Sequence, residues 1–342
     1  MGKILIIGAG AMGAAFSVPC IENNHNTVLV GTHLDDKFIK HINENDNFHP
    51  SLKVKLSNKT KFISHSQLND EIKELPDLIV IGTNSKGIEW SVNQISLICK
   101  HKVLPPIVLL TKGLSVYKNT YDLLVNKLER NLIDHGFKNI NISAIGGPCL
   151  AHDLANKSHS SVVIANKELK TVKWLQEILS TKYYHIFISN DLIGVEVCAA
   201  IKNIFSMVIG SAKGINNKDE THYLNTAASL FNQCLYEMEF FVKFLNGKKD
   251  TVYGLAGIGD LYVSATGGRN SLMGSYLGKG YVYSDAKKIK MQDITVEGAE
   301  LAFEIYTLVK KDFKLKQLPL LLTMVDCIVN NKKIDIRWDL FN

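Results

Sequence analysis

Short apolar runs separated by longer, mixed polar stretches dominate the first half of the chain. We predict strands at six runs rich in Val, Ile and Leu: Lys3–Ile7, Thr27–Val30, Leu78–Ile81, Ile107–Leu110, Ile140–Ala144 and Ser161–Ile164. The polar segments between them, such as Asp35–Asn45 and Asn119–Asp134, are compatible with helices. Strands that alternate with helices indicate βαβ units and a mostly parallel sheet, in which ligands bind at the carboxyl ends of the strands.

The pattern changes near residue 190, where β-branched runs become scarce and long apolar stretches at helical spacing follow. We predict four helices here, interrupted by the glycine-rich stretch Gly254–Gly280: Asp191–Ile209, Leu224–Leu245, Val296–Val309 and Leu318–Val329. The sequence therefore predicts an α/β protein. A sheet domain covers residues 1–189, and an all-helical domain covers residues 190–342.

Bulk properties narrow the range of functions. The formal charge of +6 is spread along 342 residues without a dense basic block, so a nucleic-acid partner has no support. The cysteines form no CxxC pair, which argues against a zinc site or a disulfide scaffold. An apparent strand begins at Lys3, which leaves no room for a signal peptide, and the apolar run Leu318–Val329 is too short to span a membrane. We expect a cytoplasmic protein with no metal site and no stable membrane insertion.

A glycine-rich loop follows the first predicted strand. Its sequence, Gly8-Ala9-Gly10-Ala11-Met12-Gly13, is a GxGxxG element that opens a predicted helix. The first glycine permits a tight turn, the second lets the backbone approach a pyrophosphate, and the third allows close packing of helix on strand. The helix N-terminus adds N–H donors. We therefore predict a Rossmann-type domain whose residues Gly8, Gly10, Ala11, Met12 and Gly13 bind a dinucleotide.

The second predicted strand ends in Gly31-Thr32-His33 rather than in an acidic residue. Asp or Glu at this position would bind the ribose 2′-hydroxyl and favour NAD, and its absence leaves room for the 2′-phosphate of NADP. No arginine stands there to hold that phosphate. Thr32 and His33 are the expected cofactor contacts, and Asp35 and Asp36 are expected at the start of the next helix. The choice between NAD and NADP stays open.

Further motifs follow in a fixed order. They are Thr111-Lys112-Gly113-Leu114, Gly146-Gly147-Pro148, Glu196–Asn203 (EVCAAIKN), Gly254–Asn270 (GLAGIGDLYVSATGGRN), Leu277-Gly278-Lys279-Gly280 and Val296-Glu297-Gly298. Together they resemble the NAD(P)-dependent glycerol-3-phosphate dehydrogenase family, over nearly the whole chain. The resemblance implies reversible hydride transfer between nicotinamide and C2 of dihydroxyacetone phosphate or sn-glycerol 3-phosphate. It also implies an active site in the cleft between the two domains and a supply of glycerol 3-phosphate for phospholipid synthesis.

Lys202 lies in the apolar helical stretch Val195–Ile209, where a lone lysine is costly unless it has a partner. Ketone reduction needs a proton for the carbonyl oxygen, and the reverse reaction needs a base. A buried lysine can serve both ways, because desolvation lowers its pKa and a nearby carboxylate partly restores it. The alternative is a lysine that extends along the helix to solvent. The resemblance makes Lys202 the general acid/base and Asp260, otherwise a helix-capping aspartate, its partner.

Arg269 stands out because the chain otherwise uses lysine almost throughout. Its only arginines are Arg130, Arg269 and Arg337. An arginine inside a glycine-rich segment suggests that the guanidinium fork is needed to bind two phosphate oxygens, which lysine cannot do. The alternative is a solvated loop arginine. The resemblance adds substrate contacts at Lys112, Gly147, Asn203, Ser264, Gly268 and Asn270, a catalytic role for Lys112, and cofactor contacts at Lys112, Ala151, Arg269, Thr295 and Glu297.

The chain also departs from the family pattern. The departures are Cys149 in place of a small hydroxyl residue, Thr83-Asn84-Ser85 in place of a valine-proline-serine turn, and Met12, Ser264 and Gly268. None removes a proton donor, carboxylate or phosphate ligand. Two other functions remain: a second two-domain dehydrogenase such as ketopantoate reductase, and a non-catalytic dinucleotide sensor, which would need only the glycine loop. We expect a small phosphorylated substrate as partner, and the sequence leaves room for a homodimer.

Overall fold

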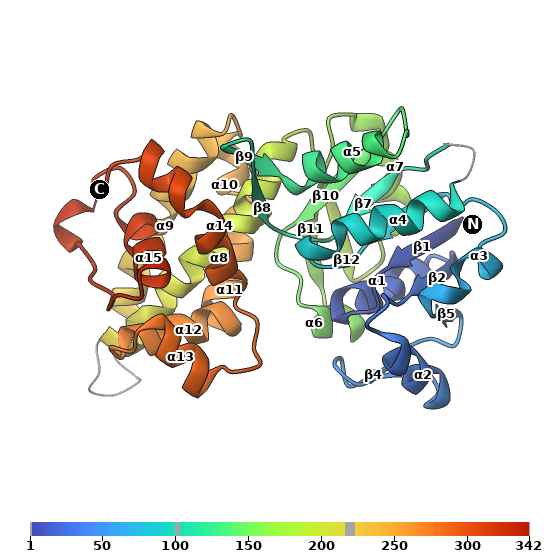
Figure 1. The fold of residues 1–342 in the computed structure, drawn as a ribbon, viewed down its shortest axis with the longest axis horizontal. Helices are drawn as coiled ribbons and strands as arrows, with labels where there is room; N and C mark the ends of the chain where they lie inside the picture. The colour runs from blue at the N-terminus through green and yellow to red at the C-terminus, as the bar shows by residue number, and fades with distance from the viewer. Residues whose placement is uncertain (1, 100–102, 216–222, 342) are drawn as a thin grey trace. The chain divides into compact units, whose positions relative to one another are not determined.

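The computed structural model describes residues 2–99, 103–215 and 223–341. The chain divides into two compact units, coloured by residue number in Figure 1. The first unit comprises Met1–Lys112 and Leu124–Leu192, and the second comprises Gly113–Leu123 and Ile193–Asn342. The chain therefore crosses between the units three times. A functional division at residues 189/190 stays a prediction.

One eight-stranded sheet forms the centre of the first unit, in the order β12-β11-β10-β7-β6-β1-β2-β5. Its strands are β1 (Lys3–Ile7), β2 (Asn26–Val30), β5 (Thr60–Ile63), β6 (Leu78–Ile81), β7 (Ile107–Leu109), β10 (Ile142–Gly146), β11 (Ser160–Ala165) and β12 (Tyr184–Ser189). Every pair is parallel except β10 with β11. The predicted α/β fold with a mostly parallel sheet is confirmed. The central strands are continuous apolar runs because both faces of the sheet are covered.

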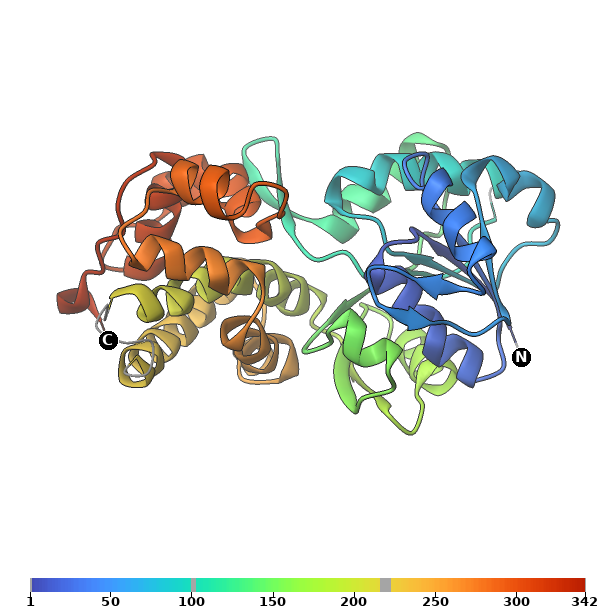
Figure 2. The ribbon, with the colours of Figure 1, turned by 90° about the horizontal axis from the view of Figure 1, so that it is seen from below.

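Helices cover both faces of this sheet. They are α1 (Ala11–Glu22), α2 (Asp36–Glu44), α3 (Leu68–Glu71), α4 (Ile88–Ile98), α5 (Leu124–Asp134), α6 (Ala151–Ala155) and α7 (Leu169–Leu179). Helix α1 packs against α6 and α7, whereas α4 packs against α5, and Figure 2 shows these two groups on opposite sides of the strands. The buried side chains of Ile6, Phe16, Leu29 and Val80 belong to the core between helices and sheet.

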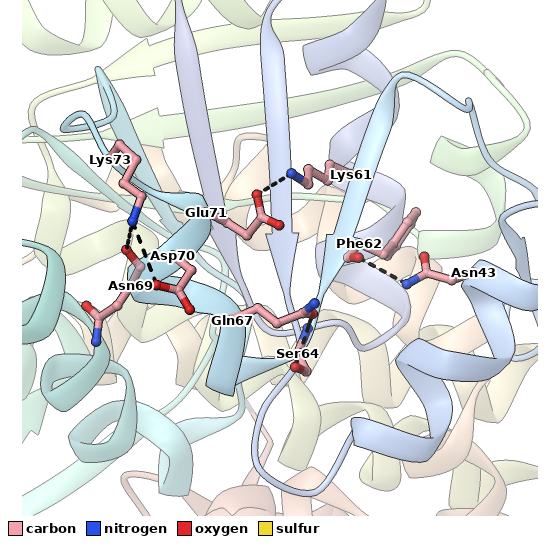
Figure 3. A network of polar contacts seen from close by, with 9 residues as sticks. All are labelled: Asn43, Lys61, Phe62, Ser64, Gln67, Asn69, Asp70, Glu71 and Lys73. Carbon is pink, nitrogen blue, oxygen red and sulfur yellow. Dashed lines mark hydrogen bonds and ion pairs between the residues drawn. The ribbon is translucent and has the colours of Figure 1, made fainter.

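Strand β5, which the apolar pattern did not predict, lies at the edge of the sheet beside β2. Polar contacts attach it to its neighbours (Figure 3). The Asn43 side chain of α2 donates to the Phe62 carbonyl at 3.2 Å, and Lys61 pairs with Glu71 of α3. The strand has only four residues and carries an exposed lysine, so its own sequence signal is weak.

The second unit is built around α8 (Leu192–Ile215), a mostly apolar helix that carries Lys202. The other helices are α9 (Leu224–Phe244), α10 (Lys249–Val252), α11 (Asp260–Thr266), α12 (Arg269–Gly278), α13 (Tyr283–Lys290), α14 (Glu297–Asp312) and α15 (Pro319–Val329). Helix α8 is long and apolar enough to cross a membrane, but 89% of its most apolar window is buried inside the protein. It is therefore a core helix of the helical unit.

The glycine-rich stretch Gly254–Gly280 does not interrupt the helices, and that expectation was wrong. It forms a π-helical turn at Leu255–Gly259, followed by α11 and α12. Its glycines allow α12 to lie backbone to backbone against α8. A Cβ atom on Gly274 would lie 1.9 Å from the Met207 carbonyl oxygen, and one on Gly278 would lie 2.1 Å from that of Ser211. Here glycine serves close helix packing rather than turns.

A hairpin from the first half of the sequence joins the helical unit. Its strands are β8 (Leu114–Tyr117) and β9 (Thr120–Leu123), so the predicted helix over Asn119–Asp134 begins only at Leu124. Asn119 has a φ of +58° and turns the chain between the two strands. The Tyr121 ring packs edge-on against Phe241 of α9 with centroids 5.3 Å apart, and the Val116 N–H donates to Glu304 of α14 at 2.8 Å.

Candidate active site

The GxGxxG loop connects β1 to α1 in the context that the sequence predicted. Gly8 has a φ of +114°, and a Cβ there would lie 2.8 Å from the backbone of Gly82 and of Thr83. A Cβ on Gly13 would lie 2.1 Å from the Gly8 carbonyl oxygen. At Gly10, with a φ of −63°, a Cβ would meet no atom within 4 Å. Gly8 and Gly13 are thus required by the fold, whereas Gly10 leaves open space before the N-terminus of α1, as an approaching pyrophosphate needs.

Thr32 and His33 follow β2 at its carboxyl end. The Thr32 N–H and hydroxyl both donate to one carboxylate oxygen of Asp35, at 2.8 and 2.7 Å. Asp35 and Asp36 lie at the start of α2, as predicted. The His33 ring lies 5.8 Å from that of Trp90, measured between centroids. The Asp35 carboxylate is therefore engaged in its own turn, and the structure keeps both NAD and NADP open.

Lys112 lies just after β7, at the carboxyl edge of the sheet. Its ammonium donates to the Gly147 carbonyl at 3.1 Å, which brings together two predicted site residues from neighbouring strands. The Thr111 hydroxyl donates to the Thr83 carbonyl at 2.5 Å. Gly147 has a φ of +111°, so glycine suits this turn. Ala151, a predicted cofactor contact, is the first residue of α6 shortly afterwards.

Lys202, Asp260 and Ser264 form a buried polar cluster inside the second unit. The Lys202 ammonium on α8 pairs with the Asp260 carboxylate and donates to the Ser264 hydroxyl at 2.9 Å. Lys202 is 7% exposed and Asp260 2%. Asp260 is the first residue of α11, which continues the π-helical turn Leu255–Gly259 without a break. Lys202 does not extend to solvent, and its ammonium can hold or release a proton beside the carboxylate.

Asn270 has a structural role that the sequence did not reveal. Its amide nitrogen donates to the Asn203 side-chain oxygen at 3.1 Å, and its own oxygen accepts the Gly298 N–H at 2.9 Å. The side chain is buried and connects α12 with α8 and with the start of α14. A contact of Asn270 or Asn203 with a phosphate stays a prediction.

Arg269 opens α12 and forms an ion pair with Glu297, the first residue of α14. Their side chains are 55% and 38% exposed. Gly268, just before it, has a φ of +95°, where glycine is favoured. Thr295 is exposed two residues before Glu297. A guanidinium that holds a carboxylate at the surface can exchange it for a phosphate at small cost, because an exposed ion pair contributes roughly 0–1 kcal/mol.

The two family models that match this chain describe the same family. The model described as NAD-dependent glycerol-3-phosphate dehydrogenase N-terminus matches residues 3–172, and the corresponding C-terminus model matches residues 191–338. The NADP(+)-dependent glycerol-3-phosphate dehydrogenase of Archaeoglobus fulgidus is 29% identical, covering 91% of this chain and 92% of its own. The glycerol-3-phosphate dehydrogenase [NAD(P)+] of Latilactobacillus sakei is 27% identical, and the match covers 90% of this chain and 87% of that protein. The crystal structure of the Coxiella burnetii glycerol-3-phosphate dehydrogenase has a TM-score of 0.81 at 23% identity. The match covers 97% of this chain and 96% of that structure.

Proposed function

Since this chain belongs to the NAD-dependent glycerol-3-phosphate dehydrogenase family, we propose that it transfers a hydride reversibly between NAD or NADP and C2 of dihydroxyacetone phosphate or sn-glycerol 3-phosphate. The observation that carries the proposal is the buried cluster of Lys202, Asp260 and Ser264. A dinucleotide-binding protein without chemistry has no use for an ammonium and a carboxylate buried together, since burial of two charges is costly. This cluster therefore favours an enzyme over a non-catalytic sensor.

The first unit is proposed to hold the cofactor. The open space at Gly10 and the helix N-terminus at Ala11 and Met12 fit a pyrophosphate. Bound there, the nicotinamide would supply the hydride for reduction and accept it in oxidation. Thr32 and His33 lie beyond the carboxyl end of β2, and we propose that they contact the adenosine end of the cofactor.

The Lys202 ammonium is proposed to move the proton. In reduction, a hydride is added to C2 while the ammonium gives a proton to the carbonyl oxygen, so that an alcohol forms and the lysine becomes neutral. In oxidation the neutral amine takes the hydroxyl proton back. Asp260 holds the ammonium in place through its ion pair, and Ser264 accepts a second N–H and limits its rotation.

Arg269 is proposed to bind the phosphate of the substrate, with Asn270 as a further phosphate contact, and Lys112 is proposed to help position the substrate. A fork-shaped donor can hold two phosphate oxygens, and binding energy from this remote group positions the reacting carbonyl. In this proposal the ion pair between Arg269 and Glu297 breaks when the substrate phosphate binds to Arg269. The predicted location in the cytoplasm, a role in phospholipid synthesis and a homodimer stay part of this proposal.

An assay with three ketones tests the proposal. The purified protein is mixed with NADH and, separately, with NADPH, and the loss of nicotinamide absorbance is followed with dihydroxyacetone phosphate, dihydroxyacetone and ketopantoate. We expect turnover with dihydroxyacetone phosphate. Turnover with ketopantoate alone would instead identify a ketopantoate reductase, and cofactor binding without turnover of any ketone would identify a sensor.

A further inference from the structure

The glycine loop is held from outside by a histidine forty residues further along the chain. His49, in the short strand β3 (Phe48–His49), places its Nε2 atom 3.1 Å from the carbonyl oxygen of Ala9, the residue between Gly8 and Gly10. The histidine is completely buried. We infer that His49 is a positioning residue for the cofactor, which orients the Ala9–Gly10 peptide so that the loop is ready to bind a pyrophosphate. This inference rests on the proposed dinucleotide role of the loop.

The hydrogen bonds of His49 define its protonation. The Leu52 N–H lies 3.2 Å from Nδ1 and can only donate, so Nδ1 must be an acceptor without a proton. In a neutral ring the proton then resides on Nε2, which donates it to the Ala9 carbonyl. Burial lowers the pKa of His49, which keeps the ring in this neutral form near neutral pH. Nδ1 thus accepts one hydrogen bond and Nε2 donates one.

The contact acts on the cofactor-binding atoms through the peptide plane. The carbonyl of Ala9 and the N–H of Gly10 belong to the same planar trans peptide, so they point in opposite directions. A donor that holds the carbonyl therefore also sets the direction of the N–H. This peptide has glycine on one side and follows Gly8, so the loop itself resists a rotation of the plane only weakly. The bond from His49 removes that freedom.

The histidine is itself on a rigid support. Strand β3 pairs with β4 (Val54–Lys55), with His49 opposite Val54. The His49 ring packs edge-on against Phe38 of α2 with centroids 5.0 Å apart, and Leu52 in the connecting turn is buried. The small hairpin, whose two strands are too short for independent stability, is thereby attached to the core. Through His49, the hairpin connects Phe38 of α2 with Ala9 of the glycine loop.

Two amide substitutions separate the contact to Ala9 from the packing of the hairpin. The amide nitrogen of Gln corresponds in reach to Nε2, so His49→Gln can still donate to the Ala9 carbonyl. The shorter His49→Asn can still accept from the Leu52 N–H but does not reach Ala9. The measurement is the dissociation constant of NADH and of NADPH by fluorescence titration, with kcat at saturating cofactor and the melting temperature measured alongside.

A second buried histidine provides the control. His25 accepts from the Gly2 N–H at 3.1 Å through Nδ1, and its Nε2 lies 2.8 Å from the Ile178 carbonyl oxygen. It has the same pattern of backbone bonds as His49 and lies in the same unit, but it does not contact the glycine loop. His25→Asn should therefore destabilise the fold to a similar extent while leaving cofactor affinity unchanged.

We expect His49→Asn to weaken cofactor binding by roughly 2- to 13-fold, the range for one lost hydrogen bond. His49→Gln should bind within about twofold of wild type, and kcat at saturating cofactor should fall less than affinity. If His49→Asn does not fold, His49→Leu also removes the donor to Ala9, and its loss of affinity is compared with that of His25→Leu, which likewise loses both hydrogen bonds of its ring. Equal affinity in His49→Asn and wild type, equally weak binding by both amides, or an equal loss in His25→Asn would overturn the inference. A wild-type protein that binds neither cofactor would overturn the proposed function as well.

Discussion

We predict that replacing Lys202 and Asp260, singly and together, affects stability and activity differently. Asp260→Asn removes the carboxylate beside an ammonium that is 7% exposed. Loss of one partner of a buried ion pair costs about 3–5 kcal/mol of unfolding free energy. Lys202→Met should cost a similar amount, because it removes the ion-pair partner of the Asp260 carboxylate, which is 2% exposed.

The double variant Lys202→Met/Asp260→Asn removes both charges and should be more stable than Asp260→Asn alone, because no buried charge is left without its partner. Its activity should not recover. A positioned general acid contributes roughly 10²–10⁴-fold to turnover. The kcat of every variant without Lys202 should therefore fall by roughly 100-fold or more. Urea unfolding followed by circular dichroism gives the stabilities, and nicotinamide oxidation with dihydroxyacetone phosphate gives kcat. Retention of more than about a tenth of wild-type kcat in Lys202→Met would refute the general-acid role.

Two further predictions address the cofactor loop and the pH dependence of stability. Gly10→Val should fold normally, because a Cβ there meets no atom within 4 Å. It should weaken NADH and NADPH binding by about tenfold or more, which corresponds to at least ~1.4 kcal/mol. Unchanged affinities in fluorescence titration would show that the nucleotide binds elsewhere. Burial raises the pKa of Glu237 from 4.5 to about 7, although the N–H groups of Leu320 and Leu321 each donate to its carboxylate at 2.8 Å. Because the pKa in the folded protein exceeds that in the unfolded chain, the contribution of this group is fully present below pH 4.5 and is lost as the pH rises through about 7. Relative to Glu237→Gln, wild type should therefore lose about 3 kcal/mol of unfolding free energy over this interval. Parallel pH profiles of the two proteins in urea unfolding would show that Glu237 stays ionised throughout.

The alternation of apolar runs and polar stretches was sufficient to predict the fold class, because central parallel strands are buried on both faces. Strands β1 and β6 are continuous apolar runs for this reason. The same pattern cannot show an edge strand such as β5, which has four residues and an exposed lysine. It also led to an error at Gly254–Gly280, where a high glycine content indicates turns only if nothing packs against the glycines. Here Gly274 and Gly278 face the backbone of α8.

Site residues were easier to predict individually than in their contacts. Lys202 was conspicuous as a lysine in an apolar helix, and Arg269 as an arginine in a lysine-rich chain. The bridge from Asn270 to Asn203 and to Gly298, and the contact of His49 with Ala9, each join residues that are 28 or more positions apart. Such contacts exist only once the chain has folded, because they depend on which helices and strands become neighbours. No local sequence pattern records them.

The preference for a phosphorylated ketone tests the central claim most directly. The quantity is the ratio of kcat/KM for dihydroxyacetone phosphate to that for dihydroxyacetone, measured for wild type and for Arg269→Lys under the same saturating cofactor. We predict a strong wild-type preference, and a fall of about 10- to 100-fold in Arg269→Lys, because lysine keeps the charge but loses the two-point grip on phosphate. A ratio that is unchanged in Arg269→Lys would show that Arg269 is not the phosphate ligand, and a wild type that does not distinguish the two ketones would contradict the proposed function itself.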